Sequence, residues 1–136
     1  IILSPFTIFD VINMVVCAGG IPIFADVDKK TITINIENIS KCYTEDVAGI
    51  LITHTHKLNT DIDKIVAFKN EKKIFLIEDC AISFGGFYNN KFIGTIGDVG
   101  FYSFGMFKFI SSLNGGFIVT DNKEISNIVT VNHVMI

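Results

Sequence analysis

Two charged residues follow the ends of two apolar segments in this sequence, and their positions could bring them together. Asp79 follows Glu78 at the end of the apolar run at residues 74–77, and Lys108 lies five residues after Ser103, which ends a second apolar run. If both runs are strands of an open α/β sheet, their carboxyl ends lie at the edge where such sheets bind ligands. The spacing therefore predicts a carboxylate and an amine at one rim of a sheet.

Lys108 has apolar neighbours on both sides, namely Met106, Phe107 and Phe109. Such a lysine usually lies at the surface and covers apolar groups with its stem. If Phe107 and Phe109 instead desolvate the amine, its pKa falls and it can act as a nucleophile. Asp79 also has two interpretations, a helix cap or solvated acid on one side and a carboxylate held against a cationic partner on the other. The residues alone leave both pairs of alternatives open.

Other polar residues near the strand ends give weaker signals. The Ser103 hydroxyl could cap a helix or hold a phosphate, and Gly115-Gly116 allows backbone conformations that other residues resist. His54 and His56 follow a third apolar run, but two histidines alone are weak evidence for a metal site. We therefore expect no metal.

The composition limits the class of protein. A chain of 136 residues suits one domain, and its 49% hydrophobic and 18% charged residues argue against disorder. No apolar stretch reaches the roughly 18 residues that a membrane-spanning helix needs. The net charge of −3 gives no basic surface for nucleic acid, and three cysteines without metal-ligand spacing indicate reduced thiols. We expect a cytoplasmic protein without a nucleic-acid or membrane partner.

Short apolar runs alternate with helix signals along the chain. Thr7 and Thr60 each precede an aspartate by three residues, as in a capping box, and Asn35 could cap a short helix. The alternation predicts an α/β fold in three layers, a mostly parallel sheet flanked by helices. The expected strands are residues 21–25, 48–53, 74–77, 99–103 and 116–120.

Two smaller expectations complete the fold. A hairpin is expected at residues 84–92, with its turn at Asn89-Asn90. The helix behind Thr7 is expected to end at Gly19-Gly20. The face that this helix is expected to bury consists of Val11, Ile12, Met14, Val15 and Ala18.

The order of these features resembles the nucleotide-sugar aminotransferases, the DegT/StrS-like family of fold-type I enzymes that use pyridoxal phosphate (PLP). The resemblance runs almost continuously over residues 5–120 through F-T-I-F-D-V-I-N-M, A-G-G-I-P-I-F-A-D-V-D, I-E-D-C-A, F-I-G-T-I-G-D-V-G-F-Y-S-F and G-G-F-I-V-T. It implies that residues 1–136 are part of a PLP-binding large domain and that the last strand is antiparallel. A phosphate-binding segment would precede this part, and a small domain would follow it.

The resemblance also implies roles for three residues. Lys108 would bind PLP covalently and move protons between substrate and cofactor, Asp79 would keep the pyridine nitrogen protonated, and Ser103 would hydrogen-bond the cofactor phosphate. The implied reaction moves an amino group, commonly from glutamate, to a keto-sugar on a nucleotide diphosphate. Such products usually enter O-antigen and other polysaccharides. The implied enzyme is a homodimer, and this part alone is expected to be inactive.

Four positions depart from the family pattern. Ile8 stands where an aromatic ring usually stacks on PLP, and Ile82 where Gln or His usually lies near it; Phe109 and Asn114 replace a usual Asn and Glu. These departures favour an alternative, a non-catalytic relative that binds a nucleotide sugar or a partner. A dehydratase branch carries histidine in place of Lys108, which argues against that branch. An unrelated flavodoxin-like domain would need a glycine-rich phosphate loop after its first strand, which is missing.

Overall fold

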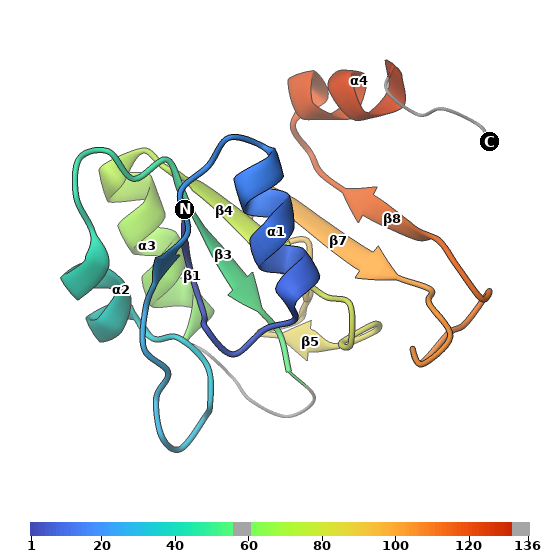
Figure 1. The fold of residues 1–136 in the computed structure, drawn as a ribbon, viewed down its shortest axis with the longest axis horizontal. Helices are drawn as coiled ribbons and strands as arrows, with labels where there is room; N and C mark the ends of the chain where they lie inside the picture. Colours follow the sequence, from blue (N-terminus) through green and yellow to red (C-terminus); the bar gives the residue numbers. More distant parts are fainter. Residues whose placement is uncertain (56–60, 132–136) are drawn as a thin grey trace.

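The computed structural model describes residues 1–55 and 61–131, and its centre is a six-stranded sheet (Figure 1). The strands lie in the order β2-β1-β3-β4-β7-β8, and all pair in parallel except β8, which is antiparallel to β7. The expected strands therefore share one sheet, and the last is antiparallel. Their bounds are Ile2–Leu3 (β1), Ile23–Phe24 (β2), Gly49–Thr53 (β3), Phe75–Asp79 (β4), Val99–Ser103 (β7) and Gly116–Val119 (β8).

Helices lie on both faces of the sheet, which confirms the predicted three-layer α/β fold. Helix α1 (Phe9–Cys17) lies on one face, and α2 (Ile36–Cys42) and α3 (Ile62–Lys72) lie on the other (Figure 1). Helix α4 (Lys123–Val131) follows β8. Within these described ranges, no helix has both the length and the apolar character that crossing a membrane requires.

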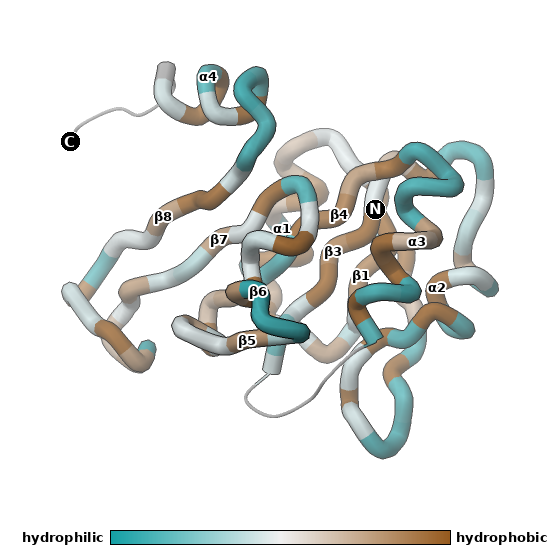
Figure 2. The backbone as a smooth tube through the Cα atoms, turned by 180° about the vertical axis from the view of Figure 1, so that it is seen from behind, coloured by the Kyte–Doolittle hydropathy of each residue, from teal (hydrophilic) through white to brown (hydrophobic). Residues whose placement is uncertain are grey.

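The main core lies between the sheet and the pair α2 and α3. Ile39 of α2 and Ile62 and Ile65 of α3 are almost fully buried and form one cluster with residues of β1, β3 and β4. Figure 2 shows apolar residues concentrated along these three strands. Burying one such side chain contributes about 1.5–3 kcal/mol relative to leaving it exposed. This face of the sheet therefore supplies much of the burial that holds the strands in register.

The expectation of a buried face on α1 is wrong. None of its residues is buried, and Met14 is 63% exposed. Val11, Met14 and Val15 instead line a groove of about 850 Å³ between α1 and the sheet. The apolar spacing thus correctly predicts which side of α1 faces the sheet, but a groove separates that side from the sheet.

The predicted helix caps have different outcomes. Asn35 caps α2, because its side-chain oxygen accepts a hydrogen bond from the N–H of Asn38 at 2.9 Å. The capping box at Thr7 is wrong, since α1 begins after Ile8 and no side chain caps it. Thr60 lies outside the described residues. Helix α1 thus begins without a side-chain cap.

The predicted hairpin is present as β5 (Phe87–Tyr88) and β6 (Lys91–Phe92), which pair antiparallel. Its turn residues Asn89 and Asn90 have positive φ angles of 47° and 63°. Tight hairpin turns favour such angles because they match the twist of the strands, and asparagine adopts them more readily than most residues.

Candidate active site

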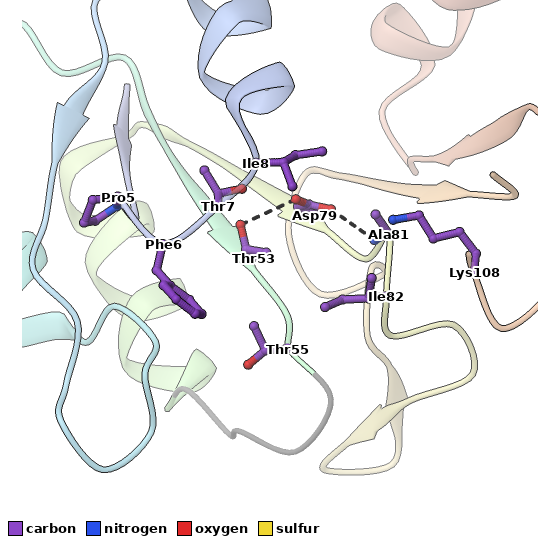
Figure 3. A pocket seen from close by; sticks show the side chains of 10 residues that line it. All are labelled: Pro5, Phe6, Thr7, Ile8, Thr53, Thr55, Asp79, Ala81, Ile82 and Lys108. Carbon is purple, nitrogen blue, oxygen red and sulfur yellow. Dashed lines mark hydrogen bonds between the residues drawn. The ribbon is translucent and has the colours of Figure 1, made fainter. Parts of the chain in front are cut away.

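A pocket of about 340 Å³ lies at the carboxyl ends of β3 and β4, and Asp79 and Lys108 are both on its wall (Figure 3). Asp79 is the last residue of β4, and Lys108 comes from the segment between β7 and β8. In Figure 3 the Lys108 amine points toward Asp79. The ion pairs within 4.0 Å in the described part of the chain do not join these two residues. Asp79 and Lys108 therefore lie at one rim of the sheet, as the spacing predicts, and their roles stay a prediction.

Asp79 is a buried carboxylate with few partners, since only 4% of its surface is exposed. One oxygen accepts a hydrogen bond from the N–H of Ala81 at 3.0 Å, and the other accepts a long one from the Thr53 hydroxyl at 3.5 Å. Burial raises the pKa of Asp79, although the Ala81 N–H and the charge of Lys108 oppose this shift. A cation placed in the pocket would favour the ionised form of this carboxylate.

Lys108 is half-buried and lines both the pocket and the groove under α1. Its neighbours Phe107 and Phe109 are 95% and 71% exposed. Most of each ring therefore faces solvent, and these exposures alone do not decide between the two alternatives for Lys108. The amine reaches toward Asp79 from a segment whose apolar side chains are turned outward.

Ser103 lies on the same rim, because it lines the groove together with Asp79 and Lys108. Its hydroxyl oxygen accepts a hydrogen bond from the N–H of Gly105 at 3.3 Å. The chain thus turns tightly after β7, and this turn carries it toward Lys108. A phosphate-binding role for Ser103 stays a prediction.

The two positions expected beside the cofactor are also in the pocket. Ile8 and Ile82 lie on either side of Asp79 in Figure 3. They give the pocket aliphatic walls where the family resemblance led us to expect an aromatic ring and a polar side chain. Ile8 is 60% exposed, so this wall is open to solvent.

The pocket also has a polar side that was not predicted from the sequence, formed by Thr7, Thr53 and Thr55, with Phe6 beside them. The hydroxyl oxygen of Thr55 is buried and has no hydrogen-bond partner within the two described ranges. Buried hydroxyl groups are normally paired, so this one marks a place that a polar group of a ligand could fill. The register of β3 and β4 places Thr53 beside Asp79, whereas Thr7 comes from the segment between β1 and α1.

Glu78 lies on the opposite face of the sheet from Asp79, because side chains alternate along a strand. It is fully buried and accepts four hydrogen bonds. The N–H groups of Ile96 and Gly97 donate to Oε1 at 2.7 and 2.6 Å, and that of Gly94 and the His54 ring donate to Oε2 at 2.8 and 2.9 Å. Burial alone would raise the pKa of Glu78, but the bonds from His54, Gly97 and Gly94 lower it.

A metal site behind the sheet is disfavoured by this bonding. His54, Glu78 and Cys80 hold ligand atoms within 4.8 Å of one another. The Glu78 oxygens, however, already accept four hydrogen bonds. Burial, together with the charges of Glu78 and Asp79, also raises the pKa of the Cys80 thiol, whereas metals bind the thiolate. His56, the other histidine considered from the sequence, lies outside the described residues.

Comparisons with known proteins match this architecture. The model of the DegT/DnrJ/EryC1/StrS aminotransferase family matches residues 1–135. The chain is 32% identical over 125 residues to the GDP-perosamine synthase of Escherichia coli O157:H7. The aligned region covers 92% of this chain and 34% of the synthase.

Two solved structures have the same fold over most of the chain. An aminotransferase from Psychrobacter cryohalolentis has a TM-score of 0.88 and 33% identity, covering 91% of this chain and 32% of that one. The E. coli GDP-4-keto-6-deoxy-D-mannose-3-dehydratase with bound hydrated PLP has a TM-score of 0.88 and 29% identity, covering 95% and 33%. The chain thus spans about a third of the length of these relatives.

Proposed function

This chain belongs to the DegT/DnrJ/EryC1/StrS aminotransferase family, and we propose that it is the central part of the PLP-binding domain of a nucleotide-sugar aminotransferase. The observation that carries this proposal is the pocket with Asp79 and Lys108 on its wall. The segments that complete the protein would add a phosphate-binding turn before residue 1 and a small domain after residue 136. We refer to that longer chain as the full-length protein.

The residues of the pocket fit PLP by their chemistry. When bound, PLP supplies an electron-withdrawing ring that stabilises negative charge on a substrate carbon. Asp79 would hold the proton on the ring nitrogen, and Lys108 would bind the cofactor covalently through its amine and then carry protons to and from the substrate. Ser103 would donate a hydrogen bond from its hydroxyl to the cofactor phosphate. Ile8, Ala81 and Ile82 would form the apolar surroundings of the ring.

The environment of Asp79 supports its proposed role. A buried carboxylate costs free energy when it is ionised, unless a positive group faces it. A protonated ring nitrogen in the pocket would provide that group, and the Ala81 N–H and the Thr53 hydroxyl would keep the carboxylate oriented toward it. A carboxylate in this environment is thus suited to hold a cationic ring.

The proposed substrate is a keto-sugar linked to a nucleotide diphosphate, and the proposed amino donor is glutamate. The names of two relatives support a nucleotide-linked sugar, GDP-perosamine synthase and GDP-4-keto-6-deoxy-D-mannose-3-dehydratase. Lys108 favours amino transfer over the dehydratase reaction, in whose branch histidine replaces the lysine. The product would enter a cell-surface polysaccharide such as O-antigen.

We also propose that the full-length protein is a homodimer. Met106, Phe107 and Leu113, on the segment that carries Lys108, are 64%, 95% and 67% exposed. Exposed apolar residues that cluster in this way commonly mark a protein interface. A second copy that covered this segment would also reduce the access of solvent to the pocket.

A second candidate is a non-catalytic relative, and the aliphatic walls at Ile8 and Ile82 favour it. An amino-transfer assay separates the two. The full-length protein is incubated with PLP, ¹⁵N-glutamate and a panel of GDP-, UDP- and dTDP-linked keto-sugars, and amino-sugar products are detected by mass spectrometry. We expect ¹⁵N in one nucleotide sugar with the full-length protein and none with residues 1–136 alone. Binding of a nucleotide sugar without transfer from any donor would favour the non-catalytic relative.

A further inference from the structure

We propose that Glu78 is a positioning residue for Asp79, which it holds in place from the opposite face of the sheet by tying together the chain segments around it. The proposal rests on the proposed function, since it concerns the carboxylate that would hold the cofactor ring. The three segments are the end of β3, the end of β4 and the loop before β7. Each contributes hydrogen bonds to this arrangement.

His54 links the Glu78 carboxylate to the backbone of Asp79. Its ring bonds to Glu78 at 2.9 Å, while its backbone N–H donates to the carbonyl oxygen of Asp79 at 2.9 Å. Its own carbonyl accepts a hydrogen bond from the Ser83 hydroxyl at 2.7 Å. One buried residue therefore contacts Glu78, the backbone of Asp79 and the loop that follows β4.

The loop before β7 is the second segment that Glu78 holds. Three N–H groups of this loop, those of Gly94, Ile96 and Gly97, donate to the Glu78 carboxylate. The loop lies against β7 so closely that a Cβ atom on Gly100 would collide with the backbone of Gly94. Gly100 in turn pairs with Glu78 in the sheet. The loop and the strand ends thus form one packed unit around a single carboxylate.

The turn after Asp79 connects this unit to the pocket. The N–H of Cys80 donates to the carbonyl of Phe101 on β7 at 2.9 Å, and the N–H of Ala81 donates to the Asp79 carboxylate at 3.0 Å. The direction of the Ala81 N–H depends on how this turn lies against β7 and His54. If the loop before β7 shifts, the donor that orients Asp79 shifts with it.

Only a carboxylate satisfies all four donors at this position. Glutamine has one acceptor oxygen and an NH₂ group that is a donor. Each Glu78 oxygen faces at least one backbone N–H, so in either orientation the NH₂ group of Glu78→Gln would face a fixed donor. Such a conflict leaves a buried N–H without an acceptor, which is costly. Glu78→Gln is therefore a sharp substitution that barely changes side-chain volume.

The test compares Glu78→Gln with Asp98→Asn in the full-length protein. Asp98 is a matched control, because it also bonds to β4 and to a basic group, accepting from the N–H of Leu76 at 2.7 Å and from Lys69 at 2.6 Å. It ends the same loop but bonds to β4 at Leu76, at the other end of the strand from Asp79, and makes none of the four Glu78 hydrogen bonds. The comparison thus separates the Glu78 hydrogen bonds from the general attachment of this loop to β4. Both variants are measured for thermal midpoint, for the Kd of PLP, for the pH dependence of the visible band of lysine-bound PLP, and for amide hydrogen exchange at His54 and Ala81.

We expect both variants to lose thermal stability. Glu78→Gln alone should weaken PLP binding about tenfold, shift the pH midpoint of the visible band and speed exchange at His54 and Ala81. His54→Asn removes one of the four donors and should change the same quantities by a smaller amount. This variant replaces Glu78→Gln in the comparison if Glu78→Gln does not fold. The proposal is overturned if the exchange rates and the visible band of Glu78→Gln and His54→Asn are the same as those of Asp98→Asn.

The exchange measurement is made without PLP, so it separates this proposal from the proposed function. A wild-type protein that forms no visible band with PLP would contradict the proposed function. Faster exchange at His54 and Ala81 in Glu78→Gln would still support the positioning role of Glu78 in that case. Unchanged exchange in a protein that does bind PLP would contradict the positioning role alone.

Discussion

Thr53 and Asp79 pair across the parallel strands β3 and β4, and the Thr53 hydroxyl donates a hydrogen bond of 3.5 Å to the Asp79 carboxylate. This places a polar group of one strand against the buried acid of the next, on the face of the sheet that carries the pocket. The bond is long, so its contribution belongs at the lower end of the usual 0.5–1.5 kcal/mol.

Thr53→Val removes this donor while preserving the shape of the side chain. We expect PLP binding to weaken by about two- to threefold, because the carboxylate loses one of its orienting groups. The Kd of PLP, from a titration of the visible band, measures this. Thr130→Val is the matched control, since the Thr130 hydroxyl bonds to the carbonyl of Ser126 at an exposed position of α4. Equal Kd values for the two variants would show that Thr53 does not assist Asp79.

Asp79→Asn should abolish PLP binding but stabilise the cofactor-free protein at neutral pH. Burial raises the pKa of Asp79 above its ordinary value of 3.8. At pH values between the ordinary pKa and the raised pKa of the folded state, the folded chain therefore binds more protons than the unfolded chain. The contribution of this group to stability therefore falls as the pH rises through that window and stays low above it. Asparagine carries no charge, so it removes this cost while it can still accept the Ala81 N–H.

Urea unfolding at several pH values checks this prediction. The stability of Asp79→Asn relative to wild type should increase as the pH rises above 3.8 and then level off. Asp46→Asn, at an exposed position, should follow the wild-type curve. An Asp79→Asn protein that is less stable than wild type at neutral pH would show that the buried charge is compensated within the fold.

Ile65→Ala should destabilise the fold strongly, because Ile65 of α3 is fully buried in the cluster that packs α3 on the sheet. Truncating a buried isoleucine costs about 2–5 kcal/mol. Phe107→Ala removes a larger side chain that is 95% exposed and should change the stability of the monomer little. The free energies of unfolding of the two variants decide this, and comparable losses would mean that the core lies elsewhere.

The sequence was sufficient for most of the sheet and for the rim of the site. The alternation of apolar runs with helix signals located β3, β4, β7 and β8, and the acid and lysine beyond two of these strands identified the two sides of the pocket. Short-range chemistry was also enough for the cap at Asn35 and for the turn at Asn89-Asn90. These features depend on residues that are close together in the chain.

The features that were missed depend on contacts between distant segments. Strand β1 has only two residues, Ile2–Leu3, which is too short for a periodic pattern to appear. The partners of Glu78 lie 16 to 24 residues away, so nothing in their spacing marks them. Thr53 faces the pocket only because of the register of β3, and a shift of one residue would turn it to the other face. The exposure of α1 likewise depends on its distance from the sheet, which the apolar spacing within the helix does not report.

In the proposed function, Lys108 is the lysine to which PLP binds. The direct measurement is borohydride reduction of the full-length protein with PLP, followed by digestion and mass spectrometry of the labelled peptide. We expect one pyridoxyl group on Lys108, loss of the label in Lys108→Ala, and retention in Lys91→Ala, which changes an exposed lysine of the hairpin. A label on another lysine, or no label at all, would contradict it.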